Sequence, residues 1–355
     1  MSVEPVDKQI LRTLVPIDGL NPEHFSELAG KVKTEVITAG RYAFKKGDED
    51  KNSVYIVAGE LELLNDAGEV LKTVKGGTAD ATHPLAPMVP RQLSARITAD
   101  ATIVRVDSDL LDLMLTWDQT GSYDVAELNA DAADGDDGEG GDWMTKLLQT
   151  KAFHRIPPAN LQTMFMTMEE VAFKAGENVI KQGDDGDYFY IISHGKCQVV
   201  RESANKPEGV PLATLNVGDS FGEEALISQA KRNATIKMLT DGNLMRLSKE
   251  NFETLLKEPL MKTCTFDEAK EMVAKGAQLL DVRLPNEFQK WNIKGSINLP
   301  LYFLRNKIDT LEESRQYVIA CDTGRRSSSA GYILSERGFD AYVLKDGLQQ
   351  AMPQV

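Results

Sequence analysis

The sequence has little cysteine and no long apolar run. Its three cysteines, Cys197, Cys264 and Cys321, are too few and too scattered for a disulfide framework. We therefore expect a reducing, cytoplasmic setting. No early apolar segment resembles a secretory leader, and no run approaches the roughly 18 apolar residues of a membrane span. No membrane partner is expected.

Positive charge is also in deficit. The chain has 40 Lys and Arg against 54 Asp and Glu, a net charge of −14. Such a balance disfavours attraction to nucleic acid or to an anionic membrane surface. The length of 355 residues predicts two or three domains with substantial cores. An oligomer is compatible with the sequence, which does not fix the oligomeric state.

The acidic and Gly-rich segment 129–142 contains almost no apolar residues. Like charges repel and nothing there can be buried, so residues 123–142 are predicted to be a solvated linker. The carboxylate spacing faintly resembles a calcium loop. The twelve-residue ligand pattern with a terminal bidentate Glu is not met, and no metal site is expected.

The segments on either side of the linker repeat one plan. Three glycines recur 136 residues later: Gly40, Gly47 and Gly59 as Gly176, Gly183 and Gly195. After the next hairpin the offset becomes 141, because Gly77 matches Gly218. Short strands with Gly-Asp turns at regular spacing predict an antiparallel roll or barrel in each copy. Short amphipathic helices, for example over 159–168, are expected to flank each roll.

The second copy carries a phosphate-binding pattern. The run Phe221-Gly222-Glu223-Glu-Ala225-Leu226 leads to Lys231-Arg232-Asn233-Ala234. It resembles the phosphate-binding cassette of the cyclic nucleotide-binding domain family, shared by cyclic-nucleotide-dependent kinases and the catabolite activator protein. The resemblance implies a β-roll over residues 143–260 that binds cyclic AMP or cyclic GMP as a regulatory ligand.

Each cassette residue has a physical reason to be there. Gly222 lets the backbone approach a ligand, and a short helix around Ala225 offers its first amides to a phosphate. Arg232 can pair with the exocyclic phosphate oxygens. The resemblance implies that Glu223 accepts a bond from the ribose 2′-hydroxyl, while Asn233 either contacts the purine or has no role. The alternative is a surface Glu–Arg pair in a β-roll without a ligand.

The base side of this predicted site lacks an obvious cover. In many relatives a long helix after the roll closes over the base. Here the helix expected over 251–258 is short, and Pro259 is expected to stop it. A cover must therefore come from elsewhere or be absent. No helix-turn-helix follows the roll.

The first copy lacks the cassette. At the 141 offset, Phe221-Gly222-Glu223 falls on Asp80-Ala81-Thr82 and Arg232 falls on Arg91. The ribose acceptor is missing, and Pro87 would disturb the short helix. Residues 1–122 are therefore predicted to be a cyclic nucleotide-binding fold that has lost its ligand and serves as scaffold or interface.

A strand, a loop and a helix follow near the C-terminus. The apolar run 318–320 is followed by Cys321-Asp322-Thr323-Gly324-Arg325-Arg326, and then by serines. Backbone N–H groups in such a loop can point inward and form an anion cradle at a helix start. Together with the arginines, this cradle is expected to lower the pKa of Cys321 and give a nucleophilic thiolate. Ser327 or Ser328 is expected to cap the helix.

Residues 261–355 resemble the rhodanese-like sulfurtransferases. The resemblance rests on the Cys321 loop, on Leu279-Leu280-Asp281-Val282-Arg283 and on Asp346-Gly347-Leu348. It implies an α/β domain with a central parallel sheet, in which Asp281 and Arg283 orient the loop. Trp291-Asn292 departs from the Gly-His that the family usually has there.

The resemblance implies sulfur transfer through a persulfide on Cys321. The donor would be thiosulfate or a persulfide, and the acceptor a thiol or a thioredoxin-like protein. Loop amides and Arg326 would stabilise the developing charge, Arg325 would attract the anionic donor, and no cofactor is needed for catalysis. Two half-reactions through one covalent intermediate predict ping-pong kinetics. The whole chain is thus predicted to be a cyclic nucleotide-regulated sulfurtransferase.

Two other interpretations remain open at this point. The chain could be a non-enzymatic cyclic nucleotide sensor that uses its C-terminal domain as a docking module. Phosphatase chemistry is the second, because related loops cleave phosphate esters. Those loops place the arginine six residues after the cysteine, whereas Arg326 is five after Cys321 and gives a smaller cradle. Cys197 and Cys264 are predicted to be structural, with a resolving-thiol role for Cys264 as the alternative.

Overall fold

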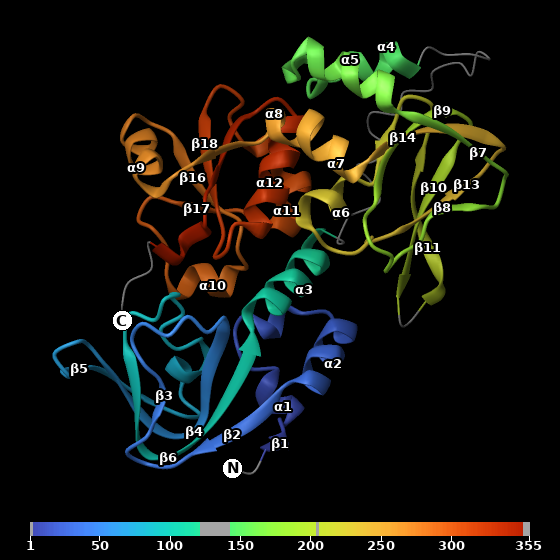
Figure 1. The fold of residues 1–355 in the computed structure, drawn as a ribbon. Helices are drawn as coiled ribbons and strands as arrows, with labels where there is room; N and C mark the ends of the chain where they lie inside the picture. The colour runs from blue at the N-terminus through green and yellow to red at the C-terminus, as the bar shows by residue number, and fades with distance from the viewer. Residues whose placement is uncertain (1–2, 121–142, 204–205, 351–355) are drawn as a thin grey trace. The chain divides into compact units, whose positions relative to one another are not determined.

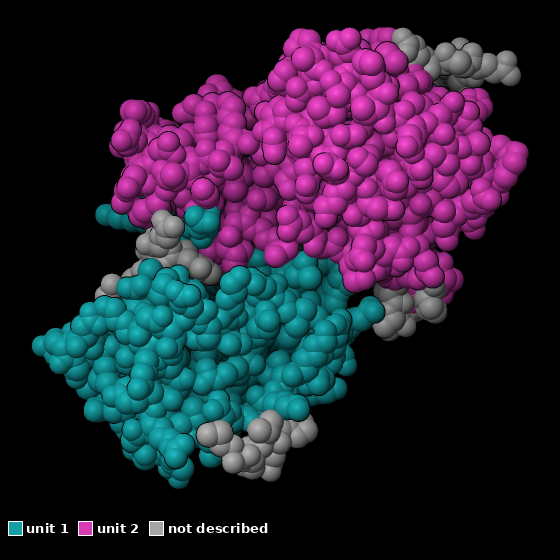
Figure 2. Space-filling view, in the orientation of Figure 1, with its two compact units in different colours: residues 1–118, 283–294, 346–355 teal, residues 119–282, 295–345 magenta. Residues whose placement is uncertain are grey.

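The structure, a computed structural model, describes residues 3–120, 143–203 and 206–350. The linker predicted over 123–142 therefore lies outside the described residues. The chain divides into two compact units (Figure 2). The first unit consists of residues 1–118, 283–294 and 346–355, and the second of residues 119–282 and 295–345.

The first unit is built on a six-stranded antiparallel sheet (Figure 1). The strand order is β1-β2-β6-β4-β5, and β3 also pairs with β6. The strands are β1 (Val3–Pro5), β2 (Lys33–Ile37), β3 (Tyr42–Phe44), β4 (Asn52–Leu64), β5 (Val70–Lys75) and β6 (Ser94–Asp107). The helices are α1 (Lys8–Leu11), η1 (Ile17–Gly19), α2 (Pro22–Lys31), η2 (Ala79–Thr82), α10 (Pro285–Lys290) and η6 (Gly347–Gln350), and α3 (Ser108–Thr120) leads out of the unit.

The second unit begins with a roll of two four-stranded antiparallel sheets, ordered β11-β10-β13-β8 and β12-β9-β14-β7. The strands are β7 (Glu169–Phe173), β8 (Asn178–Ile180), β9 (Tyr188–His194), β10 (Cys197–Ser203), β11 (Lys206–Leu215), β12 (Ser220–Phe221), β13 (Thr235–Met238) and β14 (Gly242–Ser248). Its helices are α4 (Trp143–Leu148), η3 (Phe153–Arg155), α5 (Pro158–Thr167), α6 (Glu223–Ser228), α7 (Lys249–Phe252), the π-helical turn η4 (Glu253–Lys257) and α8 (Glu258–Leu260).

A five-stranded sheet completes the second unit. Its order is β15-β19-β18-β16-β17, and every pairing is parallel. The strands are β15 (Lys262–Cys264), β16 (Gln278–Asp281), β17 (Ile297–Asn298), β18 (Gln316–Ala320) and β19 (Asp340–Leu344); the helices are α9 (Phe266–Ala274), α11 (Leu301–Lys307), η5 (Ile308–Thr310) and α12 (Arg325–Glu336). Strands β16 and β18 are almost wholly buried, as expected of strands covered on both faces.

Close backbone packing positions α12 on this sheet. A side chain at Gly331 would bring its Cβ to 2.5 Å from Val343 on β19, so the glycine is needed for the helix to approach the strand. Ala330, Ile333 and Leu334 share a buried cluster with Val282 and other apolar residues. The N-terminus of α12 is thereby held at the end of β18, where the Cys321 loop begins. No helix in the described ranges is long and apolar enough to cross a membrane.

The helical segment after the roll differs from the expectation. Pro259 was expected to stop a helix over 251–258, but the path continues from α7 through η4 and α8 to Leu260. The wider π turn lets Pro259 enter in the first turn of α8, where its missing N–H costs no hydrogen bond. The helical segment therefore ends two residues later than expected, at Leu260, and it is still a short segment.

The structure also corrects the alignment of the two copies. Leu85 N donates to Val54 O, while Phe221 pairs with Tyr190 of β9, so Leu85 and Phe221 are counterparts at the original offset of 136. The match of Phe221-Gly222-Glu223 with Asp80-Ala81-Thr82 was therefore wrong. The first copy has about five extra residues around η2 and about five fewer before Arg91. The two length differences cancel, so Arg91 still matches Arg232 at an offset of 141 residues.

Candidate functional site

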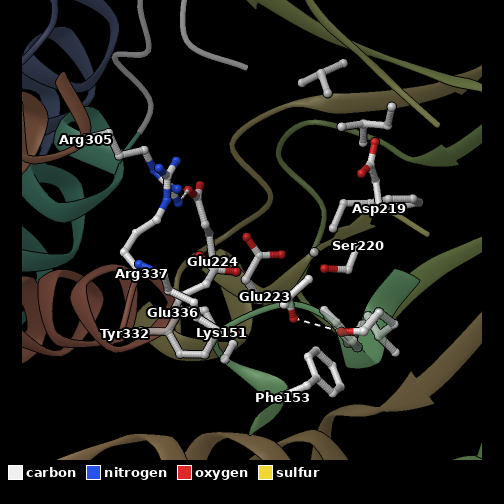
Figure 3. Close-up of a pocket in the computed structure, with 18 of the residues that line it drawn as sticks. Lys151, Phe153, Asp219, Ser220, Glu223, Glu224, Arg305, Tyr332, Glu336 and Arg337 are labelled. Atoms are coloured by element: carbon white, nitrogen blue, oxygen red, sulfur yellow. Dashed lines mark hydrogen bonds and ion pairs between the residues drawn. The ribbon is translucent and has the colours of Figure 1, made fainter. Parts of the chain in front are cut away.

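The second unit contains a cavity of about 890 Å³ beside the predicted cassette. Its wall includes Gly222, Glu223 and Arg232 from the roll and Tyr332 and Glu336 from α12. Figure 3 shows the α12 side chains on one side of Glu223 and the roll residues Asp219 and Ser220 on the other. Five predicted site residues are therefore brought together: Gly222, Glu223, Ala225, Arg232 and Asn233.

Arg232 is held from three directions. Its side chain is 3% exposed. It donates to Gly222 O at 2.7 Å, to Tyr188 O at 2.7 Å and to the Asp187 carboxylate at 2.9 Å. Gly222 has φ of +95°, a conformation that suits glycine and turns its carbonyl to the guanidinium. The arginine is thus oriented before any ligand arrives.

Helix α6 begins directly after Gly222. Ala225 is buried in its first turn, and a Cβ at Gly186 would lie 3.0 Å from that of Ala225, so the roll approaches the helix closely here. Glu223 Oε2 is a buried oxygen that accepts no hydrogen bond from the described residues. Burial, reinforced by the charge of Glu336, raises the pKa of Glu223 to about 7. Its carboxylate therefore lies in the cavity wall, ready for a donor.

Glu224 and Asn233 interact with each other. The Asn233 amide donates to the Glu224 carboxylate, which also accepts from Arg305 of α11 at 3.0 Å. Burial raises the pKa of Glu224, and the nearby Arg305 opposes that rise. Asn233 was expected either to contact a purine or to have no role. In this structure its amide holds Glu224 at the cavity wall, and the purine contact stays a prediction.

The first unit contains Arg91 as a counterpart of Arg232, but its described residues contain no counterpart of helix α6. Arg91 is fully buried and donates to Asp50 at 2.8 Å and to Ala86 O at 3.0 Å. Ala86 has φ of +38° and takes the place of Gly222. The segment from 87 to 90 contains no helix that would match α6. Within this unit Asp80 accepts instead from Lys72 at 3.2 Å and from Lys290 at 3.0 Å.

The Cys321 loop surrounds the thiol with donors. Cys321 Sγ accepts from the backbone N–H of Gly324 at 3.2 Å and of Ser327 at 3.3 Å, and the thiol itself donates to Ser327 Oγ at 3.4 Å. Gly324, with φ of +101°, occupies the N-cap position of α12. Two amides at a helix start thus face one sulfur, an arrangement that stabilises a thiolate.

The serines do not cap the helix as expected. Because α12 already begins at Arg325, Ser327 and Ser328 lie inside its first turn. Their hydroxyls donate back to Gly324 O at 3.0 and 2.8 Å. The left-handed glycine makes the turn tighter than a serine cap would allow, which is why the capping prediction was wrong.

The two loop arginines point to different partners. Arg326 is buried, and its Nη2 lies 3.5 Å from the Asp322 carboxylate. Arg325 Nη1 donates at 2.9 Å to Ser228 O, at the end of α6, and its backbone N–H lies 3.3 Å from Thr323 Oγ1. The expected donor-attracting arginine is therefore engaged with the roll in this structure.

The remaining cysteines are poor nucleophiles. Burial raises the pKa of Cys197 to about 12 and that of Cys264 to about 11, so both are neutral thiols near pH 7. In the described residues, no group of three or more His, Cys, Asp or Glu side chains could hold a metal ion.

Sequence reasoning missed the residues that α11 and α12 contribute to the cavity. These are Arg305, Tyr332, Glu336 and Arg337. A signal exists in the spacing, since Arg325, Tyr332 and Glu336 are separated by seven and four residues and so share one helix face. Only the fold shows that this face meets the roll.

Comparisons with known proteins match two parts of the chain. Residues 170–258 match the family model of the cyclic nucleotide-binding domain, and residues 265–352 match that of the rhodanese-like domain. The cGMP-dependent protein kinase, isozyme 1, of Drosophila melanogaster is 25% identical over 77% of this chain and 34% of its own length. The cAMP-dependent protein kinase regulatory subunit of Dictyostelium discoideum is 36% identical over 31% of this chain and 33% of its own.

The chain thus spans about a third of the length of these curated relatives. A solved structure of the regulatory domain of Toxoplasma gondii PKA with cAMP is 17% identical, with a TM-score of 0.31 over 76% of this chain and 95% of that one. The family matches confirm the two resemblances that the sequence suggested. This chain carries a cyclic nucleotide-binding domain followed by a rhodanese-like domain.

Proposed function

We propose that this protein is a sulfurtransferase whose output is governed by a cyclic nucleotide bound in the second roll. The observation that carries the proposal is the pair of backbone N–H groups on Cys321 Sγ, in the same compact unit as an ordered Arg232. The first supports a thiolate nucleophile, and the second supports an anion site.

The chemistry proceeds in two balanced halves. The Cys321 thiolate attacks the outer sulfur of thiosulfate, the S–S bond breaks, and sulfite leaves with the electron pair. Cys321 is then a persulfide. A thiophilic acceptor such as cyanide attacks the outer sulfur, giving thiocyanate and restoring the thiolate. The amides of Gly324 and Ser327 stabilise the sulfur anion at both stages.

The nucleotide site is supported by complementary groups. Arg232 and the first amides of α6 suit the cyclic phosphate, and the Glu223 carboxylate suits the ribose 2′-hydroxyl. The relatives are named as cAMP- and cGMP-dependent kinases, so either nucleotide is a candidate ligand. Arg325 links the two sites. It directly follows Gly324 of the Cys321 loop, and its side chain binds the end of α6.

A second candidate function is favoured by one observation. Cys321 has no exposed surface in this structure, so a sulfur donor cannot reach the thiol without a local opening. A cyclic nucleotide sensor that uses its rhodanese-like domain for docking would not need such access.

The test is sulfur transfer from thiosulfate to cyanide by the full chain, with and without saturating cyclic AMP or cyclic GMP. We expect turnover that changes with nucleotide, and a Cys321 peptide heavier by one sulfur atom after incubation with thiosulfate alone. Cys321→Ser should lose both signals, while the matched control Cys264→Ser keeps them. Absence of the persulfide with every nucleotide would favour the docking function.

A further inference from the structure

Helix α12 presents different residues to the two domains of the second unit. Ala330, Ile333 and Leu334 pack into the core of the parallel sheet. Arg325 and Tyr332 face the roll. Arg325 holds Ser228 O, and Tyr332 joins the roll's cluster, where its ring lies 6.3 Å from that of Phe252. Figure 1 shows α12 beside α6.

This contact is reinforced around the cavity. Arg155 of η3 donates to Phe339 O at 2.7 Å and to Gly338 O at 2.9 Å. Arg305 of α11 binds Glu224 of α6 at 3.0 Å, and both side chains are less than one-fifth exposed. These bonds fix α11 and the C-terminal end of α12 at the cavity wall that lies opposite the roll.

In the described part of the roll, no long helix follows the last strand to cover a ligand. The helical path from 249 to 260 is short and ends before β15. At the same cavity, the parallel-sheet domain contributes Arg305, Tyr332, Glu336 and Arg337 (Figure 3), together with residues 308–313 and Phe339. A ligand held at Arg232 and Glu223 therefore shares its cavity with side chains of the rhodanese-like domain, beside residues 149–153 at the start of the second unit.

We propose that α12, supported by α11, is the lid of the nucleotide pocket, with Tyr332 and Glu336 contacting the bound nucleoside 3′,5′-cyclic monophosphate. The proposal rests on the proposed nucleotide binding in the second roll. One helix then serves both sites: its first residue adjoins the sulfur cradle, and its third turn touches the ligand. Arg325 and Glu336 are eleven residues apart, or about 16 Å along the axis.

The chemistry of these side chains suits this role. The Tyr332 ring offers an apolar face to a purine or ribose. The Glu336 carboxylate can accept hydrogen bonds from the amino groups of a base edge. Arg305 also lies in this wall, and its positive charge offsets the repulsion between the Glu336 carboxylate and the cyclic phosphate. Arg232 binds the phosphate itself.

Photolabelling tests the contact directly. The full chain is irradiated with 8-azido cyclic AMP and, separately, with 8-azido cyclic GMP, and the labelled peptides are identified by mass spectrometry. We expect label within residues 325–337 as well as in the roll, and none in Arg232→Ala. Label confined to residues 178–236 would overturn the lid while leaving the nucleotide site intact.

Calorimetric titration of the unmodified nucleotides provides the second measurement. Glu336→Ala and Tyr332→Leu should weaken the binding of at least one nucleotide, by about fivefold or more for Glu336→Ala, or change the preference between cyclic AMP and cyclic GMP. Tyr332→Leu removes the aromatic face while keeping an apolar side chain in the roll's cluster. Glu271→Ala on α9, the same residue type on an outer helix of the domain, should change neither. Wild-type affinity and preference in both α12 variants would contradict the lid.

The two proposals fail in different ways. If the wild-type chain binds neither nucleotide, the proposal of nucleotide binding in the roll is wrong, and so is the lid proposal that rests on it. If the wild type binds and Arg232→Ala does not, while both α12 variants bind unchanged and carry the label only in the roll, the lid alone is wrong.

Discussion

Glu223 titrates near neutral pH because of where its carboxylate lies. Burial and the charge of Glu336 raise its pKa from 4.5 to about 7, while Arg305 and Arg232 oppose the shift. Glu224 and Tyr332, in the same wall, also have raised pKa values. A carboxyl with a raised pKa binds its proton more tightly in the folded protein than in the unfolded chain. Its stabilising effect is therefore present below about pH 4.5 and is lost as the pH rises through about 7.

Glu223→Gln should accordingly flatten the pH dependence of stability. We expect the free energy of unfolding of the nucleotide-free wild type to fall more between pH 5 and pH 8 than that of the variant. The difference should be on the order of 2 kcal/mol, less than the full shift would give because the side chain is partly exposed to water. Denaturant titrations at both pH values measure it, with Glu271→Gln as the control. Parallel pH profiles for the wild type and Glu223→Gln would contradict this assignment.

At the scale of single elements, the turn from β12 into α6 depends on a left-handed glycine. A Cβ at Gly222 would lie 2.8 Å from Arg232 Nη1 and 3.0 Å from Tyr188 O. Gly222→Ala should therefore displace the guanidinium and weaken nucleotide binding by roughly 10- to 100-fold, since a hydrogen bond to a charged group is worth about 1.5–3 kcal/mol.

Gly176→Ala is the matched control for this prediction. Gly176 has a similar φ of +88°, but its Cβ would meet only the flexible end of Lys237 at 4.0 Å. Both variants should lose about 1–3 kcal/mol of stability from backbone strain. Only Gly222→Ala should lose affinity in calorimetric titration. Equal affinities for the two variants would mean that the glycine shapes the turn without positioning the arginine.

The sequence was sufficient for the local motifs. The strand before Cys321, the glycine before α6 and the arginine after it are fixed by short-range chemistry. The structure places Gly222 and Arg232 at one cavity and starts the Cys321 loop at the end of β18. The alignment of the first copy failed because an insertion near η2 and a deletion before Arg91 cancel, which glycine markers cannot reveal. The cavity wall from Tyr332 and Glu336 could not be foreseen, since it joins segments about 100 residues apart through tertiary packing.

At the scale of the second unit as a whole, the proposed regulation implies that binding at one site changes the affinity of the other. Cys321 is covered while Arg325 holds α6. A nucleotide that shifts α6 should release this contact and favour entry of the sulfur donor. Thermodynamic linkage then requires the donor to raise nucleotide affinity by the same factor, typically about 5- to 150-fold.

Cys321→Ser allows both affinities to be measured without turnover. The dissociation constant for cyclic AMP or cyclic GMP should fall in the presence of saturating thiosulfate, and that for thiosulfate should fall equally with saturating nucleotide. The same variant carrying Arg232→Ala should show no effect of nucleotide. Independent affinities in Cys321→Ser would show that the two sites are not coupled.

The placement of Tyr332 in the roll's apolar cluster has a consequence for dissecting the protein. A fragment that contains the roll and ends at the junction between α8 and β15 would lose the Tyr332 ring, which fills part of the roll's interior. The severed halves should stay associated after proteolysis, and each expressed alone should be less soluble than the pair made together. Grafting this rhodanese-like domain onto another sensor would require carrying α6 with it.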